Sequence, residues 1–137
     1  MVSVKEVPSQ EFIEKLKEEL KKVEQVKPPK WIAYAKSGSH KERPPLQKDF
    51  WYIRAASIMR KLAIDGNVGV SRLRTYYGGK KRRGYKPAIS RRAAGGNIRK
   101  IMQQLESAGL VAKDKKGRRL SPQGQKLLSS VAKELKK

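Results

Sequence analysis

From Gly66 to Leu105 the chain has eleven Lys and Arg residues and no Asp or Glu. Like charges at this density repel one another, so the stretch resists close packing unless an anion is bound. The whole chain has 34 Lys and Arg against 12 Asp and Glu, a net charge of +22 over 137 residues. Such an excess destabilises a small folded protein unless a polyanion compensates for it. The usual polyanion inside a cell is nucleic acid, which we therefore expect as the partner.

The rest of the composition narrows the class of protein. The chain has no cysteine, which excludes disulfides, thiolate metal sites and a cysteine nucleophile and fits a reducing compartment. Its apolar runs are too short to cross a bilayer, and the N-terminal sequence MVSVKEVPSQEF lacks the apolar core of a signal peptide. The basic residues do not gather on one amphipathic helix, so a membrane-surface role is disfavoured. We expect a cytoplasmic protein that forms a single domain, residues 1–137.

The helical spacing of apolar residues predicts the secondary structure of the first half of the chain. A helix is expected over 9–25, followed by a short helical turn at 31–35 and a basic, proline-containing loop at 37–48. Asp49 is the expected N-cap of a strong helix over 50–64. The buried face of that helix is predicted to consist of Tyr52, Ala55, Ala56, Met59, Leu62 and Ala63.

The second half alternates short strands and helices. The expected order is a short strand at 68–70, a short helix at 72–77, a Gly-rich basic loop at 78–88, a helix at 91–108, a β-hairpin at 110–120 and a last helix at 122–135. A short helix, a turn, a longer basic helix and a hairpin make a winged helix-turn-helix pattern. We therefore predict a mostly α, winged helix-turn-helix-like domain with a small β-hairpin wing. An N-terminal helical part (about 1–66) precedes the winged-helix part (about 67–137).

Catalytic motifs are absent from the sequence. No Gly-rich phosphate-binding motif follows a strand, and no paired carboxylates stand outside the acidic N-terminal helix. His40 is the only histidine and lies in a polar loop, where a lone histidine is typically solvated. We expect no enzyme activity, no cofactor and no bound metal.

The loop at 78–88 is the first candidate binding segment. It belongs to the run YYGGKKRRGYKP, residues 76–87, whose glycines allow the backbone N–H groups to face an anion. Its cations are suited to phosphates, and Tyr77 and Tyr85 are suited to stacking on unpaired bases of RNA. The alternative for the tyrosines is a place in the core, which we expect for Tyr76 or Tyr77. The loop is predicted to be mobile alone and ordered by its partner. Its candidate contact residues are Lys80, Lys81, Arg82, Arg83, Tyr85 and Lys86.

The helix predicted at 91–108 is the second candidate. Ala94, Ile98, Ile101, Leu105 and Ala108 form its apolar stripe. Opposite the stripe, helical spacing places Arg92, Gly96, Arg99 and Gln103, with Arg91 and Lys100 beside them. An ordinary solvated helix face would mix both signs of charge, whereas this one carries only cations.

Three segments together resemble one known family. They are FWYIRAASIMRKL (50–62), VGVSRLRTYYGGKKRRGYKP (68–87) and IRKIMQQLESAGLVAKDKKGRRLSPQGQKLL (98–128). The chain resembles archaeal members of the archaeal and eukaryotic small-subunit ribosomal protein S19e family over essentially its whole length. The resemblance implies a mostly helical, winged-helix-like protein in the head of the small ribosomal subunit. It also implies binding to the 3′ domain of the rRNA and support of subunit assembly and maturation.

By match to the family, the RNA-facing candidates are Arg54 and Arg60 on the central helix and Arg99 and Lys100 on the basic helix. Spacing on the helix at 50–64 independently places Arg54 on the exposed face, with Ser57 and Lys61.

Two classes of function remain open from the residues alone. The first is a structural ribosomal protein, monomeric when free, that binds small-subunit rRNA and neighbouring ribosomal proteins. The second is a DNA-binding winged-helix transcription regulator. Basic residues also occupy the 36–48 loop, the central helix, the wing and the C-terminal tail, and this wide distribution favours burial among several RNA segments.

Overall fold

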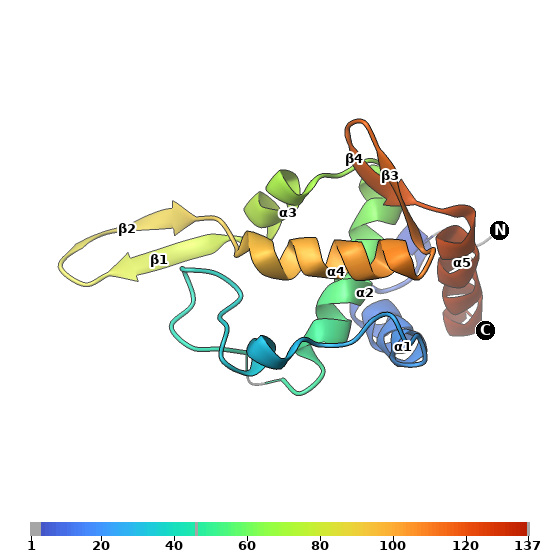
Figure 1. Cartoon of the computed structure of the whole chain (residues 1–137), viewed down its shortest axis with the longest axis horizontal. Helices are drawn as coiled ribbons and strands as arrows, with labels where there is room; N and C mark the ends of the chain where they lie inside the picture. Colours follow the sequence, from blue (N-terminus) through green and yellow to red (C-terminus); the bar gives the residue numbers. More distant parts are fainter. Residues whose placement is uncertain (1–3, 46, 137) are drawn as a thin grey trace.

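A computed structural model describes residues 4–45 and 47–136, in which α-helices are the main elements. The helices are α1 (Ser9–Lys21), α2 (Phe50–Asp65), α3 (Val70–Tyr77), α4 (Gly95–Ser107) and α5 (Pro122–Lys136), with short 3-10 turns η1 (Val4–Glu6) and η2 (Lys30–Ala33). Two antiparallel hairpins accompany them, β1 (Gly79–Arg83) with β2 (Lys86–Arg91), and β3 (Val111–Asp114) with β4 (Gly117–Leu120) (Figure 1). The predicted class, mostly helical with a small β-hairpin, is confirmed. Within the described part of the chain, no helix is long and apolar enough to cross a membrane.

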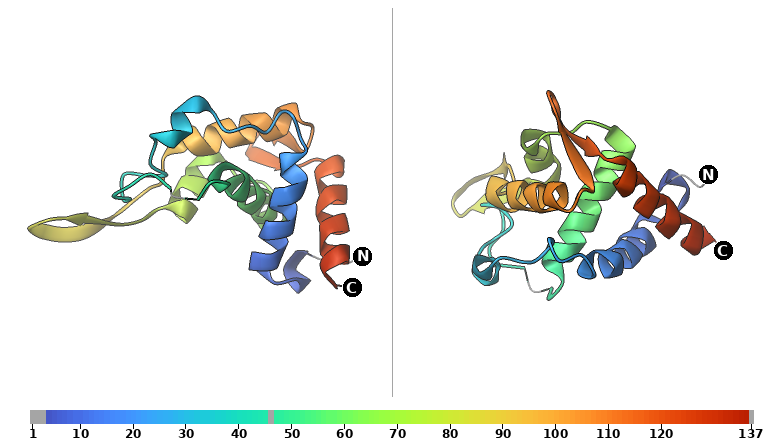
Figure 2. Two further views of the ribbon diagram at one scale, coloured as in Figure 1. Left: turned by 90° about the horizontal axis from the view of Figure 1, so that it is seen from below. Right: turned by 45° about the vertical axis from the view of Figure 1, so that its right-hand side comes forward.

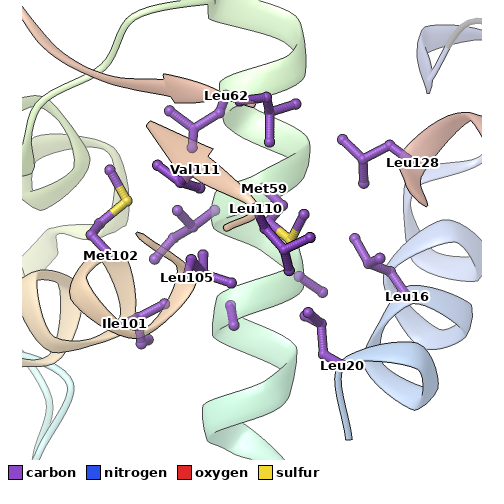
Figure 3. Packing of buried hydrophobic residues seen from close by; sticks show 14 of the residues in the cluster. Leu16, Leu20, Met59, Leu62, Ile101, Met102, Leu105, Leu110, Val111 and Leu128 are labelled. Carbon is purple, nitrogen blue, oxygen red and sulfur yellow. The ribbon is translucent and has the colours of Figure 1, made fainter. Parts of the chain in front are cut away.

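Helix α2 lies at the centre of the hydrophobic core. Helices α1 and α5 pack beside each other on one side of it, and α4 with β3 lies on the other side (Figures 1 and 2). Figure 3 shows the side chains that meet between them: Leu16 and Leu20 from α1, Met59 and Leu62 from α2, Ile101 and Leu105 from α4, and Leu128 from α5. One buried cluster thus joins the N-terminal and C-terminal parts of the chain.

The buried face of α2 is wider than predicted. Trp51 and Ile58 are buried although they were not assigned to that face, whereas Ala63 is exposed and Tyr52 is half-buried. The reason is that α2 has neighbours on two sides and so buries more than one stripe. The Trp51 indole N–H donates a 2.8 Å hydrogen bond to the Gln104 side chain, which ties α2 to α4.

Two helices are shorter than predicted. Helix α1 ends at Lys21 rather than at residue 25, because the chain turns there and buries Val26 in the core. Helix α4 begins at Gly95 rather than at 91, because residues before it are extended and Ala93 pairs with Gly38 in an isolated β-bridge. In both places a tertiary contact overrides the local helical spacing.

The segment 78–88, predicted to be a loop, contains most of the β1–β2 hairpin. Lys80 pairs with Ser90 and Lys81 with Ile89, and a register shift follows before Arg83 pairs with Lys86. The two-residue connection is Gly84-Tyr85, with Gly84 at φ 68°, as a type II′ turn requires at its first central position. The hairpin projects from the helical body (Figures 1 and 2).

The second hairpin confirms the strands predicted at 110–120. The strand expected at 68–70 is reduced to a bridge between Val68 and Arg118. A Cβ atom at Gly117 would lie 2.8 Å from the backbone of Val68 and Gly69, and the φ of Gly117 is 133°. Only glycine fits there, so this residue allows the β3–β4 hairpin to close against the chain before α3.

Candidate nucleic-acid interface

Acidic and basic residues are separated along the molecule. Three acids of α1 are paired with lysines of the same segment: Glu14 with Lys17 at 2.9 Å, Glu18 with Lys21 and Glu19 with Lys22. Lys21 also lies 3.0 Å from Asp49, just before α2. We call α3, the β1–β2 hairpin and α4 up to Leu105 the acid-free end, because these elements contain no acid. In Figure 1 the hairpin lies at the opposite end of the molecule from α5 and both termini. The basic segment that contains no acid of its own therefore lies at one end of the molecule.

The β1–β2 hairpin carries cations on both faces. Because cross-strand partners share a face, Lys81 lies with Ile89 on one side of the ribbon and Lys80 with Ser90 on the other. Arg83 Nε donates a 2.8 Å hydrogen bond to the Pro87 carbonyl, which holds its guanidinium beside the turn. Almost all of the hairpin side chains from residue 82 to 88 are exposed, and Tyr85 is fully exposed at the tip. The segment thus offers cations and a free aromatic ring and contains no acid of its own, and its Arg82 lies 3.9 Å from Glu42 of the 36–45 segment.

Backbone contacts fix the base of the hairpin. A Cβ atom at Gly78 would collide with the backbone oxygen of Arg91, so only glycine fits between α3 and the end of β2. The His40 ring packs against Gly38 and Gly79, and a Cβ atom at Gly79 would lie 3.0 Å from it. His40 is half-buried, and its Nδ1 has no hydrogen-bond partner in the described part of the chain. The expectation of a solvated histidine is wrong, because its ring joins the 36–45 segment to the hairpin.

Arg54 occupies a half-buried aromatic site. Its guanidinium carbon lies 4.0 Å from the ring centroid of Tyr77 and 5.1 Å from that of Phe50. Burial lowers the pKa of Arg54 and raises the pKa of Tyr77, whose hydroxyl is 2.6 Å from the Ser57 hydroxyl. The prediction of a fully exposed face for Arg54 and Ser57 is wrong, because α3 packs beside that part of α2 and Tyr77 covers it. No salt bridge with Arg54 occurs among the described residues, so the rings hold its charge without an anion.

Tyr76 and Tyr77 have opposite roles, which settles the alternative left open by the sequence. Tyr77 is the inward ring, and Tyr76 is 53% exposed with its ring edge-on to Tyr77. Lys61 lies 4.1 Å from the Tyr76 ring centroid and 2.9 Å from Asp65. Arg60, on the same helix, is half-buried and its Nε has no partner among the described residues.

Helix α4 presents the predicted polar face. Arg99, Lys100 and Gln103 are exposed, and the residues opposite them, Ile98, Ile101 and Leu105, are buried. Asn97 is buried as well, and its amide lies 3.4 Å from the Lys36 carbonyl.

Arg91 and Arg92 are not part of this helix, which corrects their predicted place. Arg91 ends β2, and Arg92 donates a 2.7 Å hydrogen bond to the Ser71 hydroxyl at the start of α3. Both residues lie outside α4 because the backbone just before Gly95 is extended rather than helical. The structure places Arg91 on the hairpin and Arg92 beside α3 instead.

Sequence reasoning missed the exposed side of α3. Arg72, Thr75 and Tyr76 are exposed there, whereas Leu73 is buried. The helical spacing of these residues around Leu73, within a segment without acids, was the signal that could have found them. The hairpin also had a signal, because Gly84-Tyr85 between two basic runs fits a two-residue turn.

The arrangement defines a class of protein: a small, mostly helical protein with one strongly basic, acid-free end suited to a polyanion. In the described part of the chain, no group of three or more His, Cys, Asp or Glu residues could hold a metal ion. The chain belongs to the ribosomal protein S19e family, whose model matches residues 3–137. Membership of a ribosomal protein family confirms the expectation that the chain is not an enzyme.

Individual relatives cover nearly the whole chain. Small ribosomal subunit protein eS19 of Aeropyrum pernix is 49% identical over 98% of this chain and 90% of its own length. The protein of the same name from Thermoplasma volcanium is 47% identical over the same shares. Small ribosomal subunit protein eS19B of Schizosaccharomyces pombe is 42% identical over 96% of this chain and 92% of its own. The resemblance seen in the sequence is thereby confirmed, archaeal relatives included.

Proposed function

We propose that this protein is a structural constituent of the small ribosomal subunit that binds rRNA through its acid-free end. The observation that carries the proposal is the separation of charge: most acids of α1 pair with lysines of the same segment, while the hairpin, α3 and α4 up to Leu105 present cations and contain no acid. Relatives named small ribosomal subunit protein eS19 indicate which particle contains the protein, namely the small ribosomal subunit. The rRNA in question is that of the head, the 3′ domain, and binding there supports assembly and maturation of the subunit in the cytoplasm.

The proposed rRNA contacts come from three places. Cations on the hairpin neutralise phosphates, and Tyr85 at its tip stacks on an unpaired base. The exposed face of α4 follows the phosphate backbone, and α2 presents cations fixed by aromatic rings. The residues are Lys80, Lys81, Arg82, Arg83, Tyr85, Lys86 and Arg91 on the hairpin, Arg92 beside α3, Arg99, Lys100 and Gln103 on α4, and Arg54, Arg60 and Lys61 on α2.

We also infer a winged-helix-like arrangement for the part after residue 67. In its support, α3 and α4 contact each other and the β3–β4 hairpin follows α4 in the order that this class of fold requires. The N-terminal helices α1 and α2 then complete a single domain with it. In the free state the protein is a monomer, and in the subunit its neighbours are rRNA and other ribosomal proteins.

The alternative is a DNA-binding regulator, for which a winged-helix fold would also serve. The two functions differ in the preferred polyanion. We expect tighter binding to small-subunit rRNA than to duplex DNA of equal length at the same salt concentration, measured by filter binding or fluorescence anisotropy. A duplex DNA sequence bound more tightly than the rRNA would favour the regulator.

A further inference from the structure

A groove of about 1080 Å³ lies between η1, the C-terminal end of α2, strand β4 and helix α5. These elements are at the other end of the molecule from the β1–β2 hairpin (Figure 1). The groove is therefore separate from the proposed rRNA-binding residues, and the proposed function does not use it. Its volume is enough for several side chains of a bound segment.

The floor of the groove is aliphatic. Leu62 and Ile64 line it from α2, Leu120 from β4 and Leu128 from α5. Leu62, Leu120 and Leu128 are core residues whose outer surfaces form the floor, and Figure 3 shows two of them, Leu62 and Leu128, on facing elements. The floor is thus part of the rigid core and is formed before any partner binds.

The rim of the groove is basic. Arg119, Lys126 and Lys133 line it and are exposed. They form no salt bridge or side-chain hydrogen bond with the described residues. No Asp or Glu is among the lining residues in the described part of the chain.

The acids closest in sequence are already paired elsewhere. Asp65 lies 2.9 Å from Lys61, and Glu134 lies 3.1 Å from Lys15. The rim cations are consequently available to carboxylates from outside the chain.

This chemistry suits a protein better than RNA. Among the residues that the structure describes, no aromatic side chain lines the groove, so an unpaired base has no ring on which to stack. A phosphate backbone would contact the rim and leave the aliphatic floor against water or charge, which is unfavourable. An amphipathic helical peptide with aliphatic side chains on one face and acidic side chains around them meets both requirements, since its carboxylates reach the rim and its aliphatic groups cover the floor.

We propose that this groove docks an acidic, amphipathic peptide segment of another protein. The docking proposal rests on the proposed function in one respect: the small ribosomal subunit is where this protein and the peptide segment would bind each other. The rRNA-binding end and the protein-docking groove would then lie at opposite ends of the molecule, so both can be occupied at once.

The first test uses a synthetic peptide of about 16 residues, with Leu at helical spacing and Glu at the other positions. Titration into the ¹⁵N-labelled full chain should shift the amide signals of β4, α5 and the end of α2. Lys126→Glu combined with Lys133→Glu should weaken binding at least about tenfold, because it reverses two rim charges. The matched control, Lys115→Glu with Lys116→Glu at the β3–β4 turn, changes the net charge equally and should leave the affinity unchanged.

Three outcomes of this titration would overturn the proposal. They are no binding of the peptide, signal shifts confined to the acid-free end, and equal loss of affinity in both charge-reversed variants. A control peptide with Ser in place of Leu should not bind, and equal binding by it would also count against an aliphatic floor.

The second test asks what occupies the groove in the particle. A photo-crosslinking amino acid is placed at Ser130, which is exposed and lines the groove, and in a separate variant at Tyr85 on the hairpin. Sedimentation of each variant with small subunits tests the proposed function, independently of any crosslink. In incorporated protein, the Ser130 probe should crosslink to an acidic, aliphatic segment of another protein, and the Tyr85 probe to rRNA. Crosslinks from Ser130 to rRNA alone, to a second copy of this chain, or to nothing while Tyr85 crosslinks would overturn the docking proposal.

Discussion

At the scale of single residues, Arg99 and Leu105 separate the two sides of α4. Arg99 is exposed, so replacing it should change the binding of a polyanion and leave folding unchanged. Each phosphate contact contributes about 0.9 to the slope of log affinity against log salt concentration on duplex DNA and about 0.7 on single strands. Arg99→Gln should therefore reduce the magnitude of that slope for rRNA by about 1. The slope comes from titrations at several salt concentrations, and Lys22→Gln at the far end of α1 is the control that should not change it.

Leu105→Ala should give the opposite pattern. Leu105 is fully buried, so the variant should lose roughly 2–5 kcal/mol of unfolding free energy because a cavity forms in the core. Its salt slope should stay the same in the fraction that remains folded. If Arg99→Gln leaves rRNA binding and its salt slope unchanged, or Arg99→Glu unfolds the protein, the binding face has been placed on the wrong side of α4.

His40 gives the protein a pH dependence at the base of the hairpin. Burial, and then the charges of Lys41, Arg54 and Lys36, hold the pKa of His40 below its ordinary value of 6.5. The unfolded chain therefore binds the proton more readily than the folded one. The stability contributed by neutral His40 is fully present above the unfolded pKa and is lost as the pH falls through the folded pKa.

The expected result is a lower Tm at pH 5.5 than at pH 7.5, measured by thermal denaturation. Since His40 is the only histidine, His40→Gln should remove most of this difference while both proteins bind rRNA at pH 7.5. An equal fall of the Tm in the two proteins would show that His40 is not the titrating group.

At the scale of elements, the β1–β2 hairpin is the segment least supported by the rest of the molecule. Two strands without a covering layer are marginally stable in water, and this pair is packed closely at its base, with one exposed ion pair, Arg82–Glu42 at 3.9 Å, further out. We expect trypsin to cut the free protein first between Lys80 and Lys86, ahead of Arg99 and Lys100 in α4, and rRNA to protect the hairpin. Mass spectrometry of early digestion products measures this. Equal rates of hairpin cleavage with and without rRNA would contradict binding by this element.

Local sequence patterns predicted the helices and strands themselves better than the contacts that these elements make with the rest of the chain. The apolar stripes of α4 and α5 and the Gly117 turn are encoded by neighbouring residues, so their spacing was sufficient. The start of α4 depends instead on a bridge from Ala93 to Gly38, which lies far away in the sequence. The cover over Arg54 likewise comes from Tyr77 in another helix. Contacts of this kind are not visible in the periodicity of a single helix.

The hairpin at 79–91 was missed for a different reason. Charge repulsion and glycine content suggested a loop, and both remain true of the segment. Its strands form because the Gly84-Tyr85 turn and the closely packed base at Gly78 bring two basic runs together. The candidate binding residues were found from charge alone, whereas their arrangement on two faces of a ribbon required the structure.

At the scale of the whole molecule, we propose that rRNA at the acid-free end holds this charge-separated protein in the small ribosomal subunit. The most direct measurement follows the tagged protein in cell lysate through a sucrose gradient after a high-salt wash. We predict that it stays with the small subunit. A variant with Lys80, Lys81, Arg82 and Arg83 changed to Gln should be released at lower salt than the unchanged protein. Recovery of the unchanged protein free at the top of the gradient, or with chromosomal DNA, would contradict the claim.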